Sequence, residues 1–131
     1  MIVLDTHVLL WWVSGASSLS ARAKAAIRSA LRRGPLIAST ISILEIATAV
    51  RRRRLQLNAP LGPWLDDLRA LPELRFEPVS AVIAQQAGSF DDAVPGDPAD
   101  RIIAATALSL GLRLVTADRR LAQSSAVKAV W

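Results

Sequence analysis

The chain has 131 residues, of which 52% are hydrophobic and 21% charged, so we expect one domain over residues 1–131 with its own core. It has no cysteine, which excludes disulfides, thiolate metal sites and cysteine nucleophiles, and its single histidine, His7, excludes a multi-histidine metal site. All but Lys24 and Lys128 of the 16 basic residues are arginine, and the net charge of +5 favours a polyanionic partner.

Two apolar segments resemble membrane signals, and the sequence argues against both. Residues 1–13 carry Asp5 and His7 and lack the basic start of a signal peptide. Residues 36–50 would form a helix about 22 Å long, whereas a bilayer core needs about 30 Å. Glu45 would also lie inside that segment. We therefore expect no membrane partner, and the lack of cysteine fits a cytoplasmic location.

In chain order, short apolar runs alternate with amphipathic segments. The expected strands are residues 1–4, 36–39, 75–79, 112–116 and, as a fifth, 127–130. The expected helices are residues 6–13, 20–34, 42–53, 64–71, 80–87, 101–110 and a short one that begins at Asp118. Residues 88–98 form the longest expected loop.

Two helix starts carry strong capping patterns. Ser42 and Glu45 have the spacing of a capping box, in which a serine and a glutamate three residues later bond each other's backbone. Asp97 is followed by Pro98, the residue favoured at the first helical position. Asp97 is therefore expected to cap the helix whose first turn contains Asp100.

The alternation predicts right-handed βαβ units and so an α/β fold, with a doubly wound, mainly parallel sheet of four to five strands flanked by helices. In such sheets ligands bind beyond the carboxyl ends of the strands. Asp5 follows the first expected strand and Asp118 the fourth. Glu45 lies in the helix after the second strand, and Asp100 opens the helix that leads into the fourth. The four carboxylates are therefore expected at one edge of the sheet.

Each of these acids has a structural explanation, because a carboxylate in the first turn of a helix caps free N–H groups and complements the helix dipole. Capping alone does not explain Asp100 and Glu45, since each shares a helix face with apolar residues, such as Ile103 and Ala104 beside Asp100. A carboxylate on a buried face needs a partner, and no lysine is near in sequence. Magnesium, which prefers oxygen ligands, is the simplest partner, and it suits chemistry on phosphate.

Four segments carry these acids in order along the chain. They are Met1–Trp11 (MIVLDTHVLLW), Ser42–Ala47 (SILEIA), Asp97–Ala107 (DPADRIIAATA) and Leu114–Asp118 (LVTAD). Over nearly its whole length the sequence resembles the PIN-domain ribonucleases and, more narrowly, the toxins of VapBC toxin–antitoxin pairs.

The resemblance implies a PIN-like fold and the toxin component of a type II toxin–antitoxin pair. Such a protein is a Mg²⁺-dependent endoribonuclease, with Mn²⁺ as a possible substitute, that hydrolyses cellular RNA with a metal-activated water. It is commonly a homodimer and is silenced by a cognate antitoxin protein. Matched residue by residue, the catalytic acids are Asp5, Glu45, Asp100 and Asp118, and we assign Asp5, Asp100 and Asp118 to the metal.

Three more residues are candidates for a supporting role at the site. Asp97 is an acid that many relatives lack, and it either caps the helix or contacts metal-bound water. Thr6 and Thr116 either cap the backbone or hydrogen-bond ligands and phosphate. Ala99 stands where relatives often have a bulky residue, which affects local packing rather than the ligands.

The arginine runs are candidates for contact with RNA phosphates. The residues are Arg51, Arg52, Arg53, Arg54, Arg119 and Arg120. The first four either complement the end of their helix as solvated charges, or bind RNA or an acidic antitoxin segment. Four consecutive helical residues point to all sides, so at most two can face one strand. We expect His7 to pack near Trp11 rather than act as a base.

Two alternative functions remain at this point. A catalytically inactive PIN-fold module would bind RNA or protein, although the presence of all four acids argues against it. A phosphoacceptor receiver domain also has a doubly wound sheet and clustered aspartates, but it needs a lysine after its last strand. Lys128 instead lies at the start of the expected fifth strand.

Overall fold

The computed structural model describes residues 1–131 as five strands and seven helices. The strands are β1 (Ile2–Leu4), β2 (Leu36–Ser39), β3 (Leu74–Glu77), β4 (Arg113–Val115) and β5 (Ala129–Val130). The helices are α1 (Thr6–Ser14), α2 (Ala21–Leu31), α3 (Ile41–Arg51), α4 (Leu61–Ala70), α5 (Ala81–Ser89), α6 (Pro98–Leu110) and α7 (Arg119–Gln123). Every expected strand and helix is present, with shifts of a few residues at their ends.

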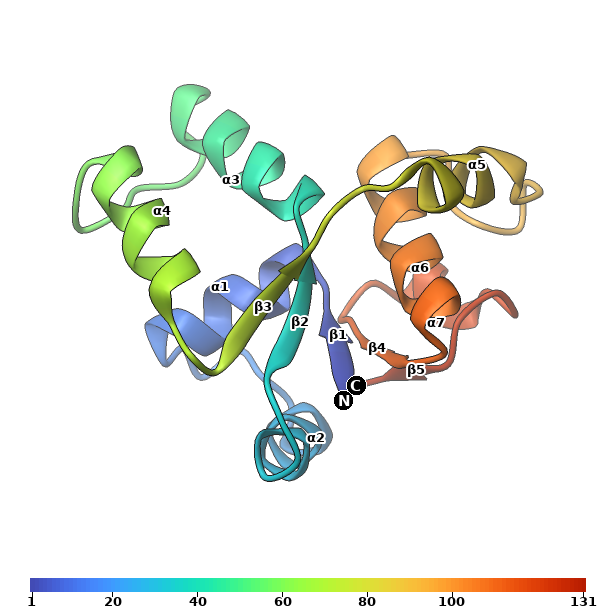
Figure 1. Cartoon of the computed structure of the whole chain (residues 1–131), viewed down its shortest axis with the longest axis horizontal. Coiled ribbons are helices and arrows are strands. Elements are labelled where there is room, and N and C mark those ends of the chain that lie inside the picture. Colours follow the sequence, from blue (N-terminus) through green and yellow to red (C-terminus); the bar gives the residue numbers. More distant parts are fainter.

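The strands form one parallel sheet in the order β3-β2-β1-β4-β5. The α/β, doubly wound fold expected from the alternation of strands and helices is confirmed. Because β1 lies at the centre between β2 and β4 and all three are parallel, the carboxyl ends of these strands lie at the same edge of the sheet. Figure 1 shows α3 and α4 on one side of this edge and α5 and α6 on the other.

The sheet is buried on both faces, which explains why its central strands are continuous apolar runs. Ile2 and Leu4 of β1 belong to a core cluster that includes residues of α1 and α2. Val3, which points the opposite way, belongs to a second cluster with Ile103 of α6 and Leu121 of α7. Side chains of the same strand therefore anchor both helical layers.

Five of the helices begin at a side chain that caps them, including Asp5, Asp97 and Asp118, which the sequence indicates as caps. Asp5, Ser20, Ser80, Asp97 and Asp118 each accept a backbone N–H of the helix they precede. Gly15 and Gly111 end α1 and α6 with left-handed φ angles of 69° and 66°, which glycine adopts without steric cost. Local chemistry thus fixes the ends of the helices that bring Asp5, Asp100 and Asp118 to the sheet.

The start of α4 differs from the expectation. Proline and glycine at residues 60–63 were expected to break the chain, with a helix beginning at Trp64, but α4 begins at Leu61. Pro63 lies in the first helical turn, where backbone N–H groups have no helical partner, so its missing N–H costs no hydrogen bond.

The end of α3 contains the only non-glycine residue with a positive φ, Arg53, at 58°. The Arg54 N–H donates to the Ala49 carbonyl at 2.9 Å, and the Arg53 N–H donates to the Val50 carbonyl at 3.0 Å. These two bonds form a Schellman turn, whose left-handed position is usually glycine. A side chain there costs about 1–2 kcal/mol.

No helix is both long and apolar enough to cross a membrane. Residues 36–50, the segment that resembles a membrane span in sequence, divide into β2 and α3 as expected.

Candidate metal-binding active site

The four sequence-predicted acids lie at or near the carboxyl-terminal edge of the sheet. Asp5 directly follows β1 and caps α1, and Asp118 follows β4 and caps α7. Asp100 is the third residue of α6, which crosses the sheet next to β1, β2 and β4. Glu45 extends from α3, the helix that follows β2. Segments far apart in the sequence therefore bring these acids to one region.

Asp5 is the most buried of the acids, with 7% of its surface exposed. Its Oδ1 accepts the Thr6 N–H at 2.8 Å, and its Oδ2 accepts the Thr116 hydroxyl at 2.7 Å. The Thr116 oxygen also accepts the backbone N–H of Asp118 at 3.0 Å. The fully buried Thr116 hydroxyl therefore links the acids that follow β1 and β4.

Glu45 does not form the capping box expected from the sequence, and it is not in the first turn. Helix α3 begins at Ile41 with Thr40 as its cap residue, and the Ser39 hydroxyl accepts the Ile41 N–H at 3.1 Å. Ser42 therefore lies inside the helix, fully buried. Its position beside α1 gives its hydroxyl a different partner.

That partner is Thr6, whose hydroxyl lies 2.7 Å from the Ser42 hydroxyl. The Thr6 hydroxyl donates to Oε1 of Glu45 at 2.6 Å, so a chain of hydroxyls holds this carboxylate. Burial raises the pKa of Glu45 above its usual value, the Thr6 hydrogen bond lowers it, and the negative charges of Asp5 and Asp97 raise it further. The net effect is a raised pKa.

Asp100 shows the strongest electrostatic effect in the chain. Burial, which has the largest effect, and the negative charges of the neighbouring acids together raise its pKa from 3.8 to about 7. Those neighbours are Asp5, Asp97, Asp118 and Glu45. The repulsion shows that the predicted acids are electrostatically close, as the topology requires.

Asp97 is exposed, and its Oδ1 accepts the backbone N–H of Asp100 at 3.1 Å. The capping role expected for Asp97 is confirmed. Its charge also raises the pKa of both Glu45 and Asp100. Asp97 therefore adds to the negative potential of the site from the N-terminus of α6.

Arg101 organises the loop before α6, and the sequence reasoning missed it. Its guanidinium donates to the backbone carbonyls of Ala87 at 2.9 Å, Val94 at 3.3 Å and Asp91 at 3.4 Å, and also to that of Phe90. It also lies 5.9 Å from the centre of the Phe90 ring. The signal that could have indicated this role is an arginine near the start of a helix that follows a long loop.

The predicted arginines divide by position. Arg52 and Arg54 line the same pocket as Glu45 and Asp97, whereas Arg51 and Arg53 do not. Arg119 and Arg120, which follow Asp118, are exposed on α7. His7 lies 5.9 Å from Trp11 between ring centres, so its expected packing on α1 is confirmed.

The donor set suits a hard divalent cation, because Mg²⁺ and Mn²⁺ prefer carboxylate oxygens. Oδ2 of Asp118 and Oε2 of Glu45 accept no hydrogen bond within the chain, and neither do the side-chain oxygens of Asp100. None of these acids forms an ion pair with a basic side chain. In this conformation no three of them are close enough together to hold one ion. The residues fit a cation in their chemistry and charge, and the side chains must move to converge on it.

Comparisons with known proteins agree with this geometry. The profile of the PIN domain matches residues 2–126. Ribonuclease VapC22 of Mycobacterium tuberculosis (strain ATCC 25618 / H37Rv) is 39% identical to this chain over 120 residues, covering 92% of this chain and 88% of that protein.

Solved structures show the same fold at lower identity. The crystal structure of VapBC2 from Rickettsia felis, bound to a promoter DNA fragment, has a TM-score of 0.70 at 16% identity and covers 98% of this chain and 97% of its own. FitAcB from Neisseria gonorrhoeae has a TM-score of 0.68 at 24% identity, with coverages of 98% and 96%. A toxin–antitoxin complex from Klebsiella pneumoniae has a TM-score of 0.64 at 21% identity, with coverages of 97% and 95%.

The fold and the site thus define an α/β protein with an acidic cluster at the carboxyl ends of a five-stranded parallel sheet. The chain belongs to the PIN-domain family and, within it, to the VapC-type proteins. Membership of this family excludes the receiver-domain alternative.

The raised pKa of Asp100 predicts a specific dependence of stability on pH. Because its pKa is 3.8 in the unfolded chain and about 7 in the folded one, the folded state retains the proton to higher pH. The stabilisation is full below the unfolded pKa and is lost as the pH rises to about 7. We expect the free energy of unfolding of the wild type in EDTA, minus that of Asp100→Asn, to decrease across this interval in urea titrations. A difference independent of pH would contradict the shift.

The contacts of Arg101 predict that lysine cannot replace it. A single ammonium cannot reach carbonyls spread around the guanidinium, so Arg101→Lys leaves part-buried carbonyls unpaired, at a cost of about 1–3 kcal/mol. Hydrogen exchange should also become faster in residues 89–97. The exposed Arg28 on α2 provides the control, since Arg28→Lys should change stability by less than about 0.5 kcal/mol. Equal stability of the two variants would show that the contacts do not hold the loop.

Proposed function

We propose that this protein is a divalent-cation-dependent endoribonuclease and the toxin of a type II toxin–antitoxin pair. The observation that carries the proposal is the placement of Asp5, Glu45, Asp100 and Asp118 at or near one edge of the sheet, on segments that follow β1 and β4 and on α3 and α6. The raised pKa of Asp100 supports their proximity. The 39% identity to Ribonuclease VapC22 supports RNA as the substrate. Mg²⁺ is the proposed ion, with Mn²⁺ as a substitute.

In the proposed site, Asp5, Asp100 and Asp118 hold the cation. When bound, such an ion offsets the negative charge that builds on a phosphate and lowers the pKa of an attacking water. Asp5 is already oriented by Thr6 and Thr116, and Asp118 by its capping bonds to the first turn of α7. These bonds fix the positions of two ligands before any ion arrives.

Glu45 is the proposed proton acceptor. The Thr6 hydroxyl occupies its Oε1, which leaves Oε2 available to a water molecule. Its raised pKa suits this role, because a base whose pKa lies nearer to the working pH accepts a proton more readily. Water then loses its proton to Glu45 as its oxygen attacks the phosphorus of the phosphodiester. The bond from phosphorus to the leaving ribose oxygen breaks, and that oxygen takes up a proton from solvent.

The partners follow from the same assignment. The structures similar to this chain include complexes of toxins with antitoxins, which supports an antitoxin protein as the partner that silences this one. We also propose a homodimer, as the family resemblance implies. Light scattering of the isolated chain tests this state, and a monomer at all concentrations would contradict it.

Removal of one metal ligand should abolish catalysis without unfolding the chain. Loss of an outer partner of a metal ligand typically lowers activity by about 10- to 100-fold. We therefore expect Thr116→Val to lose activity in that range and Asp5→Asn to lose more than about 100-fold. EDTA should stop the cleavage of single-stranded RNA by the wild type, and Mg²⁺ or Mn²⁺ should restore it.

Asp92→Asn serves as the matched control, because Asp92 is an exposed loop acid with no hydrogen bond in the chain. It should retain wild-type activity. Cleavage by Asp5→Asn at the wild-type rate would overturn the mechanism. Calorimetry with Mn²⁺ distinguishes an active site from an inactive binding module. For an active site we expect a heat of Mn²⁺ binding in the wild type that disappears in Asp5→Asn, and for an inactive module no such heat.

A further inference from the structure

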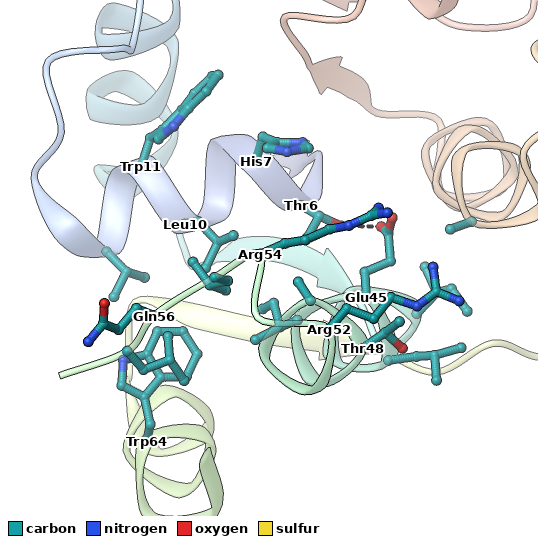
Figure 2. Close-up of a pocket in the computed structure, with 18 of the residues that line it drawn as sticks. Thr6, His7, Leu10, Trp11, Glu45, Thr48, Arg52, Arg54, Gln56 and Trp64 are labelled. Atoms are coloured by element: carbon teal, nitrogen blue, oxygen red, sulfur yellow. Dashed lines mark hydrogen bonds between the residues drawn. The ribbon is translucent and has the colours of Figure 1, made fainter. Parts of the chain in front are cut away.

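A pocket of about 910 Å³ lies beside the acidic cluster, between α1, α3 and α4. Its lining includes the polar residues Thr6, Glu45 and Asp97 and apolar residues such as Leu10 and Trp64. Arg52 and Arg54 also line it. Figure 2 shows their side chains extending toward the end of the pocket where Glu45 lies.

The left-handed residue Arg53 places these two arginines in the same pocket. On a continuous helix, residues 52 and 54 would point in directions about 200° apart. The chain instead leaves α3 through the Schellman turn at Arg53, whose φ is 58°, and Arg52 and Arg54 both line the pocket. A non-glycine residue in this conformation is uncommon, and such outliers often occur at functional sites.

The two guanidinium groups have no partner of their own. Both side chains are exposed, and neither donates a hydrogen bond within the chain. The ion pairs of the chain lie elsewhere, within α4 and within β3, so no carboxylate is within 4.0 Å of Arg52 or Arg54. Acidic and basic side chains thus line one pocket without neutralising each other.

We propose that Arg52 and Arg54 form a phosphate-binding site, which takes the RNA phosphate next to the one that is cleaved. This assignment rests on the proposed function, because the acidic cluster defines where the cleaved phosphate lies. The planar guanidinium forks of two arginines match the oxygens of a phosphate. Arg51 and Arg53, which do not line the pocket, are outside the proposed site.

The arrangement of charge favours RNA over an acidic protein segment. An acidic peptide could also bind the two arginines, but the proposed function already places a phosphate strand at the acids beside this pocket. A nucleic acid strand carries phosphates in regular succession. One phosphate can lie at the cation-binding acids while its neighbour lies at Arg52 and Arg54, so a single strand uses both ends of this charge pattern.

The test measures binding without cleavage. Fluorescence anisotropy with a labelled single-stranded RNA in EDTA compares Arg52→Ala and Arg54→Ala with Arg51→Ala, which removes the same charge from the same segment. We expect each pocket variant to bind RNA about tenfold more weakly. In the variant that combines Arg52→Ala and Arg54→Ala, the slope of log affinity against log salt concentration should become shallower by about 0.7, as expected for the loss of one phosphate contact.

Two control variants keep the outcome interpretable. Arg51→Ala should bind within about twofold of the wild type, since a phosphate contact there is not expected. Arg53→Gly should retain RNA affinity and raise the unfolding midpoint, because glycine adopts the left-handed conformation freely. Equal loss of affinity in Arg51→Ala and Arg52→Ala would overturn the proposal in favour of diffuse attraction by the whole arginine run.

Competition with an oligoglutamate peptide tests the other occupant. If the pocket variants lose affinity for this peptide but bind RNA like the wild type, the site belongs to an acidic protein segment and the proposal is wrong. Because no divalent ion is present, these results do not depend on catalysis. Continued cleavage by Asp5→Asn would therefore count against the proposed function. Unchanged RNA binding by the pocket variants would count against the phosphate-binding site.

Discussion

The main constraint on this structure is the repulsion among carboxylates that the topology brings together. Parallel strands in the order β3-β2-β1-β4-β5 direct three neighbouring carboxyl ends to one edge, where Asp5 directly follows β1 and Asp118 caps α7 shortly after β4. The chain tolerates the repulsion through helix N-termini, the Thr116 and Thr6 hydroxyls, and a proton on Asp100 that persists to a pH of about 7. The hydroxyl and helix contacts hold the carboxylates in place without neutralising them, and above a pH of about 7 Asp100 adds its own negative charge to the site.

Much of this arrangement could be predicted from the sequence because local patterns determine it. Apolar runs buried on both faces gave the strands, and Asp5, Asp97 and Asp118 were recognisable as caps at helix starts. The spacing of Ser42 and Glu45 misled, since its capping geometry is local whereas the contact that prevails, with Thr6 on α1, joins residues 36 and 39 positions apart.

Long-range packing also explains the other features that the sequence could not provide. The four consecutive arginines after α3 look equivalent in sequence, and only the left-handed backbone of Arg53 separates Arg52 and Arg54 from their neighbours. The pKa of Asp100 reflects burial together with the charges of four acids from other segments or turns. Both effects require knowledge of the three-dimensional arrangement, which a pattern within one segment does not contain.

The loop that precedes α6 is held in an unusual manner, since Arg101 contacts it only through backbone carbonyls and the face of one ring. Carbonyls are the same whatever side chain they accompany. The identity of most residues in this loop can therefore change over evolution while its shape, and with it the placement of Asp97 and Asp100, is preserved. Arg101 thus leaves the surface beside the predicted catalytic acids free to diversify while the position of those acids is kept.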